Sequence, residues 1–407
     1  MIKRSLQKKI LQTSRAFPIL LLTGPRQVGK TTLLQMSAEK NRSYVSLDNL
    51  EDRILAQTDP ALFLQNNPSP LIIDEVQYAP QLFSYLKIEV DRQQKPGMYW
   101  LTGSQKFHLM HGISESLAGR IAILDLLGLS QSEIEMRGKV PRPFLPNKEW
   151  IQKRVRDRPN LLSLKAVYQQ IWRGSFPKVH QNPKLDRNLF YRSYLQTYVQ
   201  RDVREIQNIT NTITFNAFMV AIAARTGQVV NYADISRDAG IDNKTVKSWL
   251  AILETSGLIY LLQPYFNNRT KRIRKSPKLY FLDTGLCAYL TKWPNFQSLA
   301  AGAMSGAILE THLFIEILKS YWNNAQEGHF YYYRDFEKRE IDLVIESGNT
   351  LYPVEFKKTA TPSLNASKSF SLVKNSGRKV GLGAVVCFTE KLIPLSREVT
   401  AIPIGYL

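Results

Sequence analysis

The chain has few cysteines and no long apolar run. Only Cys287 and Cys387 occur among 407 residues, far apart and without a CxxC pair. This excludes a disulfide framework and a cysteine zinc site, and it suits a reducing compartment, so the cytoplasm is the expected location. No apolar stretch is long enough to span a bilayer, and no cleavable segment follows the basic N-terminus. We therefore expect neither a membrane anchor nor a signal peptide.

Acidic residues are scarce relative to basic ones. The 34 Asp and Glu residues face 54 Lys and Arg residues, which gives a net charge of +20. A surplus of this size favours polyanions or anionic membrane surfaces as partners, although a protein that touches neither can also carry it. The length is sufficient for two or three domains, each with its own core.

A glycine-rich segment carries the first chemical motif. Residues 24–31 read GPRQVGKT and match G-x-x-x-x-G-K-[ST], the phosphate-binding loop. An expected strand over 17–22 precedes it and an expected helix over 32–39 follows, which a plain glycine turn would not require. In such a loop, Lys30 reaches the β- and γ-phosphates of ATP and Thr31 ligates Mg²⁺. The predicted ATP contacts are Gly24, Pro25, Arg26, Gln27, Val28, Gly29, Lys30, Thr31 and Thr32.

An acidic pair ends the next informative strand. The apolar residues 71–73 are followed by Asp74 and Glu75. This is the Walker B pattern, in which Asp74 holds the Mg²⁺ shell and Glu75 polarises the attacking water. A strand that ends in a solvated acidic turn is the alternative, and the upstream loop makes it the weaker one.

Further polar residues are candidates for contact with the γ-phosphate. Ser104 or Gln105, at the polar end of the strand expected at 97–105, could sense it, or could simply end the strand. Arg120 or Arg201 could act on it within one chain or from a neighbouring subunit of a homo-oligomer, with a structural salt bridge as the alternative. Strands that alternate with helices predict a parallel sheet with these motifs at its carboxyl edge.

These motifs resemble those of one group of bacterial and archaeal AAA-type P-loop ATPases. The resemblance rests on GPRQVGKT, LIIDEVQ, LTGSQ, ESLAGR and LSQSEI, and later on WRGSFP at 172–177, YLQTYVQRDV at 194–203 and YFLDTGL at 280–286. In that group, a C-terminal domain of unknown function follows the ATPase core. The resemblance covers nearly the whole chain and implies ATP binding and a P-loop fold. It implies little about the biological role.

Residues 213–283 have the pattern of a winged helix. Three helices and two wing strands are expected, over 215–225, 231–238, 242–250, 258–262 and 278–282. Asn231 is a suitable cap for the second helix. The polar third helix and the basic stretch 267–275 fit phosphate contacts, so DNA is the expected partner. A winged helix used only for protein contacts within the ATPase is the alternative.

The C-terminal third carries a second acidic constellation. Glu310 lies on an expected apolar helix, Asp342 near the start of a strand, and Glu355 and Lys357 on the next strand. Strand periodicity puts Glu355 and Lys357 on one face. The D…E-x-K pattern resembles the PD-(D/E)XK nuclease core, although Ile341 stands where the family usually has proline.

In such a core, three carboxylates bind the metal ion and one lysine assists the reaction. Glu310, Asp342 and Glu355 would share a Mg²⁺ that activates water for attack on a phosphodiester. Lys357 would steady the nucleophile or the developing charge. A nuclease fold that has lost its chemistry is the alternative, although all four side chains are kept.

The sequence thus predicts an α/β protein in four parts. These are a P-loop ATPase core with a parallel sheet (1–135), a helical lid and linker (136–210), a winged helix (211–290) and a restriction-endonuclease-like α/β domain (291–407). The predicted function is ATP binding and hydrolysis coupled to DNA binding, with Mg²⁺-dependent DNA cleavage as a further hypothesis. The alternative is a nucleotide-switched DNA-binding, signalling or scaffold ATPase with a silent nuclease fold.

Overall fold

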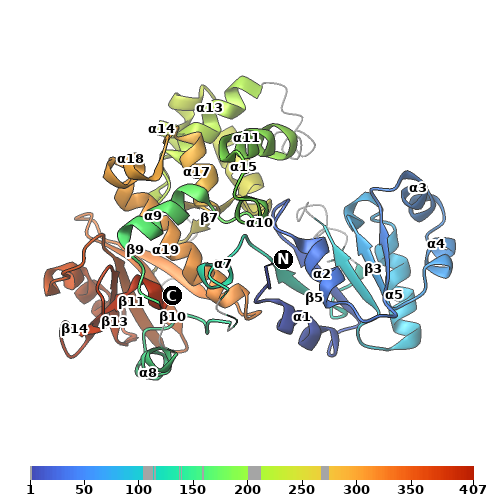
Figure 1. Ribbon diagram of the computed structural model, residues 1–407, viewed down its shortest axis with the longest axis horizontal. Coiled ribbons are helices and arrows are strands. Elements are labelled where there is room, and N and C mark those ends of the chain that lie inside the picture. Colours follow the sequence, from blue (N-terminus) through green and yellow to red (C-terminus); the bar gives the residue numbers. More distant parts are fainter. Residues whose placement is uncertain are drawn as a thin grey trace.

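Three β-sheets organise the molecule, and each belongs to a different part of the chain. The computed structural model describes residues 2–103, 113, 116–136, 138, 140–157, 160–199, 212–266 and 275–407. A five-stranded sheet lies in the N-terminal part, a small three-stranded sheet in the middle and a seven-stranded sheet at the C-terminus (Figure 1). No helix within these described ranges is both long and apolar enough to cross a membrane.

The N-terminal sheet is parallel, as the sequence predicts. Its strands run in the order β2-β3-β4-β1-β5. Along β1, Leu20 and Leu22 pack in one core cluster while Ile19 and Leu21 pack in another, so both faces of the sheet are covered. The strands are β1 (Ile19–Thr23), β2 (Ser43–Ser46), β3 (Leu71–Asp74), β4 (Tyr99–Thr102) and β5 (Ile121–Asp125). The helices are α1 (Gln7–Ser14), α2 (Lys30–Ser37), α3 (Leu50–Thr58), α4 (Pro60–Asn66) and α5 (Leu82–Gln93).

A mainly helical region follows. Its helices before the small sheet are α7 (Gln131–Ile134), α8 (Lys148–Arg156), α9 (Leu164–Arg173), α10 (Pro177–Gln181) and α11 (Arg187–Tyr194), with a π-helical turn over Leu195–Val199. A basic, proline-rich stretch near the start of the predicted lid and linker is anchored to the rest of the molecule. Phe144 and Trp150 are buried edge to face, and Arg154 in α8 donates to the carbonyl oxygens of Tyr406 and Leu407. Two aromatic residues and Arg154 therefore anchor a segment that also carries exposed charges.

The helices and strands expected between residues 212 and 283 are present with shifted ends. Asn231 accepts from the backbone N–H groups of Ala233 and Asp234, so the predicted cap is confirmed. The three strands are antiparallel in the order β6-β8-β7. The elements are α13 (Thr212–Ala223), β6 (Gln228–Val229), α14 (Tyr232–Ala239), α15 (Asn243–Thr255), β7 (Ile259–Leu262) and β8 (Lys278–Phe281).

Two of the motifs shared with the ATPase group meet inside this region. Asp283 accepts from the backbone N–H and hydroxyl of Ser175 at 2.7 and 2.8 Å and from the Tyr191 hydroxyl at 2.9 Å. A Cβ on Gly174 would lie 2.0 Å from that hydroxyl, so only glycine fits there. The segments 172–177 and 280–286 therefore form a structural hub around Asp283.

The C-terminal sheet is mixed. Its strands follow the order β14-β15-β13-β11-β10-β9, with β12 beside β11; β9, β10 and β11 are antiparallel, while β11, β13 and β15 are parallel. The elements of this part are α17 (Thr284–Leu290), α18 (Phe296–Ala301), α19 (Ser305–Trp322), β9 (His329–Arg334), β10 (Glu340–Ser347), β11 (Thr350–Phe356), β12 (Lys379–Val380), β13 (Gly383–Cys387), β14 (Ile393–Pro394) and β15 (Val399–Pro403).

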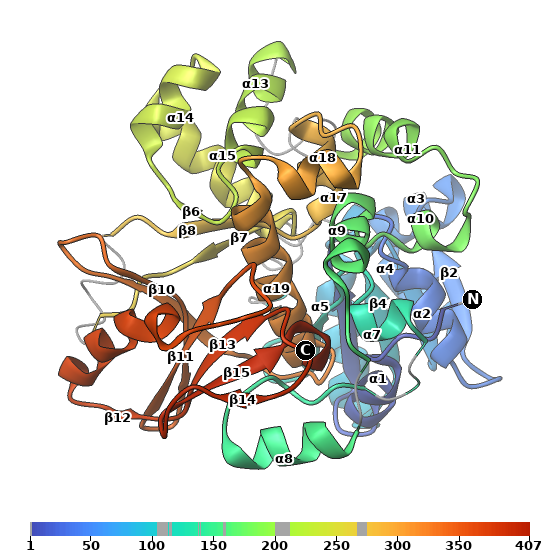
Figure 2. The ribbon, with the colours of Figure 1, turned by 60° about the vertical axis from the view of Figure 1, so that its left-hand side comes forward.

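Helix α19 links the C-terminal sheet to the rest of the chain (Figure 2). Its buried Glu316 accepts from the backbone N–H of Gln131 at the start of α7, 2.8 Å away. Its buried Lys319 donates to Glu316 and to the carbonyl oxygen of Leu129. The end of the ATPase core is thus fixed directly to a helix from the C-terminal third.

Candidate functional site

The loop between β1 and α2 has a backbone that only glycine permits. Gly24 has φ 139°, and a Cβ there would lie 2.1 Å from the carbonyl oxygen of Leu126. Gly29 has φ 90° and immediately precedes α2. The predicted phosphate loop therefore joins the carboxyl end of a buried strand to the N-terminus of a helix, the geometry that suits an anion.

Lys30 lies within this loop. Its side chain is buried, and its ammonium group donates to the carbonyl oxygens of Gly24 and Pro25, both at 2.9 Å. These two carbonyl groups therefore hold the ammonium group over the loop.

The next residue makes the contact that joins the two Walker motifs. The Thr31 hydroxyl lies 3.0 Å from both carboxylate oxygens of Asp74, which ends β3. Tyr44 of β2 also donates to Asp74, at 3.0 Å. Burial raises the pKa of Asp74 while the bonds from Thr31 and Tyr44 oppose the rise, and burial with the Asp74 charge raises the pKa of Tyr44 to about 12.

Tyr44 is a site residue that the sequence did not reveal. It lies in an ordinary polar and apolar strand, and only the parallel pairing of β2 with β3 brings it beside Asp74. A tyrosine two residues before the end of an edge strand has no motif of its own. The neighbouring strand order, which sequence patterns did not give, was the missing information.

Glu75 takes a left-handed backbone conformation. Its φ and ψ are 55° and 43°, and the Gln77 amide donates to its carboxylate. The Arg26 guanidinium lies 4.0 Å from the same carboxylate. This acid is thus oriented by its own turn and by the phosphate loop, and it adjoins Asp74 as the sequence predicts.

The other candidates for the γ-phosphate are not brought to the loop. Ser104, Gln105 and Arg201 lie outside the described residues. Arg120 forms a two-point pair with Asp91 of α5, at 2.6 and 2.9 Å. Its carbonyl oxygen accepts from Ile19 at the start of β1, so Arg120 lies at the amino edge of the parallel sheet, opposite the loop. The prediction that it acts on the γ-phosphate within its own chain is therefore wrong.

The phosphate loop touches the rest of the molecule on two sides. Arg4, before α1, donates to the carbonyl oxygens of Val28 and Leu127, both at 2.7 Å, and pairs with Glu133 of the LSQSEI motif. Pro25 and Val28 also face residues of the middle region across a gap of about 10 Å³. These residues include Ser175, Gly257 and Leu286. Arg4 was not among the predicted site residues, because a single basic residue before a helix carries no signal.

The second acidic constellation is brought together, but around a lysine. The ammonium group of Lys278 in β8 lies 2.5 Å from Glu310, 2.5 Å from Glu340 and 3.8 Å from Asp342. Lys278 is only 2% exposed. Burial alone would lower the pKa of Lys278, but the surrounding carboxylates hold it well above its usual value.

The remaining predicted residues lie next to this cluster. Lys357 donates to Glu355 at 2.7 Å, and Asp342 accepts from the backbone N–H of Phe356 at 2.9 Å. Burial and the Asp342 charge raise the pKa of Glu355 to about 8, and burial raises the pKa of Glu310 to about 7. Both acids are therefore shifted toward their neutral forms.

The metal prediction does not fit this arrangement. Among the residues that the structure describes, no group of three His, Cys, Asp or Glu side chains is placed to hold a metal ion. Lys278 lies where Glu310 and Asp342 would share a cation. The sequence did not indicate this contact. Lys278 is 32 residues before Glu310, and its strand β8 belongs to the small sheet, whereas Asp342 lies in the C-terminal sheet.

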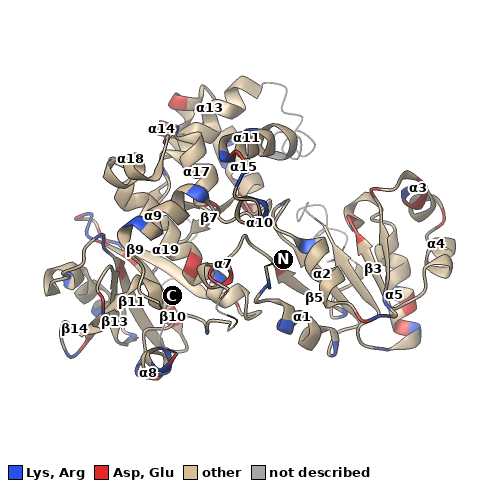
Figure 3. Ribbon diagram, viewed as in Figure 1, with Lys and Arg blue, Asp and Glu red and all other residues tan. Residues whose placement is uncertain are grey.

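The predicted nucleic-acid face is exposed on α15. Lys244 and Lys247 are both solvent-exposed, whereas Val246 between them is buried. Most of the basic stretch 267–275 lies outside the described residues; Lys275 is described and exposed. Basic side chains also occur in the N-terminal and C-terminal parts, so the positive charge is not concentrated on this helix (Figure 3).

Comparisons with known proteins divide the chain in three. An "AAA domain" model matches residues 16–135, and two models described as "Domain of unknown function", DUF8612 and DUF4143, match residues 164–297 and 305–407. Uncharacterized proteins of Mycobacterium tuberculosis and Mycobacterium bovis are each 28% identical over 405 residues, covering 98% of this chain and 83% of the relative. One of Haemophilus influenzae is 20% identical, covering 89% of this chain and 88% of the relative.

Two solved structures are among the similar ones. A Walker-type ATPase of Pyrococcus abyssi is 14% identical with a TM-score of 0.42, covering 70% of this chain and 94% of that one. RuvB of Thermotoga maritima is 18% identical with a TM-score of 0.32, covering 64% and 90%. The family match at residues 16–135 coincides with the parallel sheet, the phosphate loop and the Thr31–Asp74 contact. The N-terminal part of this chain is an AAA-type P-loop ATPase domain.

Proposed function

We propose that the chain binds and hydrolyses ATP at residues 24–31. The observation that carries this proposal is the Thr31–Asp74 contact, which places a hydroxyl and a carboxylate side by side at the carboxyl edge of the sheet. Both are oxygen ligands of the kind that Mg²⁺ takes beside nucleotide phosphates. Lys30 adds a positive charge that two backbone carbonyl groups hold over the loop.

The residues of the loop divide the work of phosphoryl transfer. The backbone N–H groups and the α2 N-terminus bind the phosphates, and Lys30 exchanges two neutral carbonyl acceptors for phosphate oxygens. Thr31 and Asp74 would hold Mg²⁺, which supplies charge neutralisation when bound. Glu75, fixed by its turn and by Gln77, accepts a hydrogen bond from the attacking water and orients it.

The test is ATP hydrolysis by a Lys30→Ala variant. We expect the rate to fall by about 100-fold or more, because the charge that stabilises the transferring phosphate is lost. Lys87→Ala, on the exposed side of α5, is the matched control and keeps the wild-type rate. A Lys30→Ala protein that hydrolyses ATP as fast as wild type would disprove the assignment.

We further propose that nucleotide state is coupled to the middle region, and that this region binds DNA as a winged helix. The close packing of Pro25 and Val28 against Ser175 and Gly257 supports the coupling. The three helices followed by a small antiparallel sheet, with Lys244 and Lys247 exposed on α15, support the DNA contact. Fluorescence anisotropy with a labelled duplex at low and high salt tests it. Binding that is equal in wild type and Lys244→Gln/Lys247→Gln would contradict it.

For the C-terminal part, the Lys278 contacts favour the silent alternative. The antiparallel β10–β11 pair with β13 parallel beside it suits a nuclease-like sheet. A lysine between Glu310 and Asp342 opposes a divalent cation there by like charge and by occupancy. We therefore propose a nucleotide-switched protein whose C-terminal domain does not cut DNA. Plasmid cleavage by the wild type with Mg²⁺ and ATP, lost in Lys357→Ala, would contradict this.

Two further predictions concern the cellular location and the oligomeric state. Cys287 and Cys387 are both buried free thiols, which is consistent with the reducing cytoplasm that the sequence predicts. A homo-oligomer stays a prediction, and the Arg120 geometry leaves only a neighbouring subunit as the place where that residue could act on nucleotide. Sedimentation with and without ATP would measure the assembly.

A further inference from the structure

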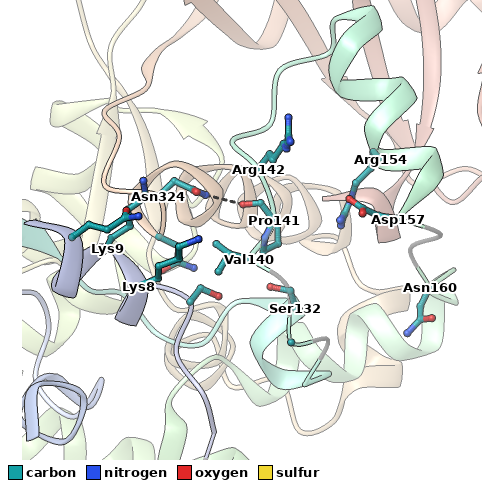
Figure 4. Close-up of a pocket in the computed structure, with 14 residues that line it drawn as sticks. Lys8, Lys9, Ser132, Val140, Pro141, Arg142, Arg154, Asp157, Asn160 and Asn324 are labelled. Atoms are coloured by element: carbon teal, nitrogen blue, oxygen red, sulfur yellow. Dashed lines mark hydrogen bonds between the residues drawn. The ribbon is translucent and has the colours of Figure 1, made fainter. Parts of the chain in front are cut away.

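A cavity of about 720 Å³ lies between three parts of the chain, and none of its lining residues belongs to the phosphate loop or to the Lys278 cluster. Helix α1 lines one side with Lys8 and Lys9, and α8 and its end line another with Arg154 and Asp157 (Figure 4). Gly138, residues 140–142 and the residues that follow α19 complete the wall. Its volume is that of an ordinary small-molecule site.

The lining is strongly basic. Lys8, Lys9, Arg142 and Arg154 line the cavity, against a single acid, Asp157. Arg154 is occupied by the carbonyl oxygens at the end of the chain. The side chains of Lys8 and Lys9 form no hydrogen bond or ion pair with any residue that the structure describes. Unpaired cations that converge on one cavity create a positive potential that attracts anions.

An amide side chain adds a second kind of contact. Asn323 lines the cavity and is 5% exposed, and its side chain has no hydrogen-bond partner among the described residues. The next residue shows the contrast, because the Asn324 amide donates to the carbonyl oxygens of Pro141 and Ser320 at 2.7 and 2.8 Å. The Asn323 amide is therefore available to a polar group of a ligand in the cavity.

We propose that this cavity binds a small phosphorylated molecule of nucleotide size. Lys8, Lys9 and Arg142 would contact its phosphate oxygens, and the Asn323 amide would bond to a polar group of the ligand. A nucleotide and a nucleic-acid strand both offer phosphates. The cavity is walled by α1, α8 and α19, which favours the smaller source.

The site is connected to the ATPase loop through the chain before α1. Ser5 lines the cavity, and its backbone N–H donates to Glu133 at 2.6 Å. The same Glu133 oxygen accepts from Arg4, which in turn donates to Val28 in the phosphate loop at 2.7 Å. A ligand held by Lys8 and Lys9 would therefore lie next to the segment whose Arg4 contacts the phosphate loop. Binding itself does not depend on ATP hydrolysis.

The experiment uses the full chain with Lys30→Ala, so that the phosphate loop does not dominate phosphate binding. Titration calorimetry with inorganic tripolyphosphate should show one saturable site. Adding Lys8→Gln/Lys9→Gln should weaken it by about tenfold or more, since two charge-assisted contacts are lost. Asn323→Ala should weaken it less. Lys40→Gln/Lys95→Gln removes two exposed charges elsewhere in the same part and should leave the affinity unchanged.

Separate titrations with ATP and with a 12-nucleotide single strand distinguish the sources. Binding of tripolyphosphate and ATP that depends on Lys8 and Lys9 supports the proposal. It is overturned if tripolyphosphate does not bind, if the two pairs of substitutions have equal effects, or if only the oligonucleotide binds. A loss of ATP hydrolysis in Lys30→Ala leaves these outcomes unaffected, so the two proposals fail independently.

Discussion

The molecule contains two acidic sites that each have a lysine nearby, and they use it in opposite ways. In the ATPase domain, Lys30 donates to neutral carbonyl oxygens while Asp74 faces a threonine hydroxyl. In the C-terminal domain, the ammonium group of Lys278 lies directly between carboxylates. In the first arrangement the lysine and the carboxylate each contact uncharged groups, whereas in the second the opposite charges contact each other directly. Retention of acidic residues therefore does not by itself indicate a cation site.

The largest expected difference between the two sites is in ATP hydrolysis. Glu75→Gln should reduce the rate by about 100-fold or more, because it removes the base that orients water, while ATP binding persists. Glu355→Gln, the corresponding change at the other site, should alter the rate by less than about twofold, since that residue does not contact the loop. Steady-state hydrolysis with a nucleotide-binding assay measures both. Equal losses of ATP hydrolysis in the two variants would show that the two sites do not differ in this way.

The second site should matter more for the stability of the fold. Lys278→Met leaves buried carboxylates without their cation, so we expect a loss of about 3–5 kcal/mol in the free energy of unfolding. Lys275→Met, at an exposed position in the same segment, should change it by less than about 0.5 kcal/mol. Denaturant unfolding measures both, and Lys278→Met/Glu310→Gln should recover part of the loss. If Lys278→Met is as stable as wild type, Lys278 does not hold the cluster together.

A metal titration sharpens the same contrast. Lys278→Ala frees Glu310, Glu340 and Asp342, which are oxygen ligands suited to a hard cation. Without nucleotide, Mn²⁺ should therefore raise the melting temperature of this variant by about 2 °C or more and leave wild type unchanged. Stabilisation of wild type by Mn²⁺ that is lost in Asp342→Asn would show that a metal enters despite Lys278.

The last expected difference concerns the pH dependence of stability. The pKa of Glu355 is about 8 in the folded protein, above its value in the unfolded chain. Between these two values the folded state binds one more proton than the unfolded state, so stability falls as pH rises. Glu355→Gln should remove up to about 1.4 kcal/mol per pH unit of that slope between pH 5 and 8. An unchanged slope in the variant would contradict the shift.

The ATPase fold was largely predictable because its signals are local. The apolar runs, the glycine loop and the acidic pair each specify a strand end within a few residues, and the parallel sheet brings those ends together. The Asn231 cap was equally local and equally accurate. What could not be predicted depends on pairing between distant segments. Tyr44 reaches Asp74 only through the order of strands, and Lys278 reaches Glu310 only through packing of the small sheet on α19.

The same distinction explains the wrong expectations. Arg120 is of the residue type that acts on phosphates, but β5 begins just after it. Arg120 therefore pairs with Asp91 at the amino edge of the sheet, opposite the phosphate loop. The stretch around α8 has the composition of a free linker, but two aromatic residues determine its place. In both cases the residue type is typical of the predicted role, but contacts with other segments of the chain determine where the residue lies.

The shared core described for β1 has a practical consequence for dissecting the chain. Leu20 and Leu22 pack in the same continuous apolar cluster as Phe176, Leu286 and Ile402, which come from every later part. A fragment ending near residue 135 would expose the part of this cluster that the later residues cover and should aggregate, although its sequence looks like an independent domain. The three parts should also melt in one cooperative transition, because none can separate without opening that common interior.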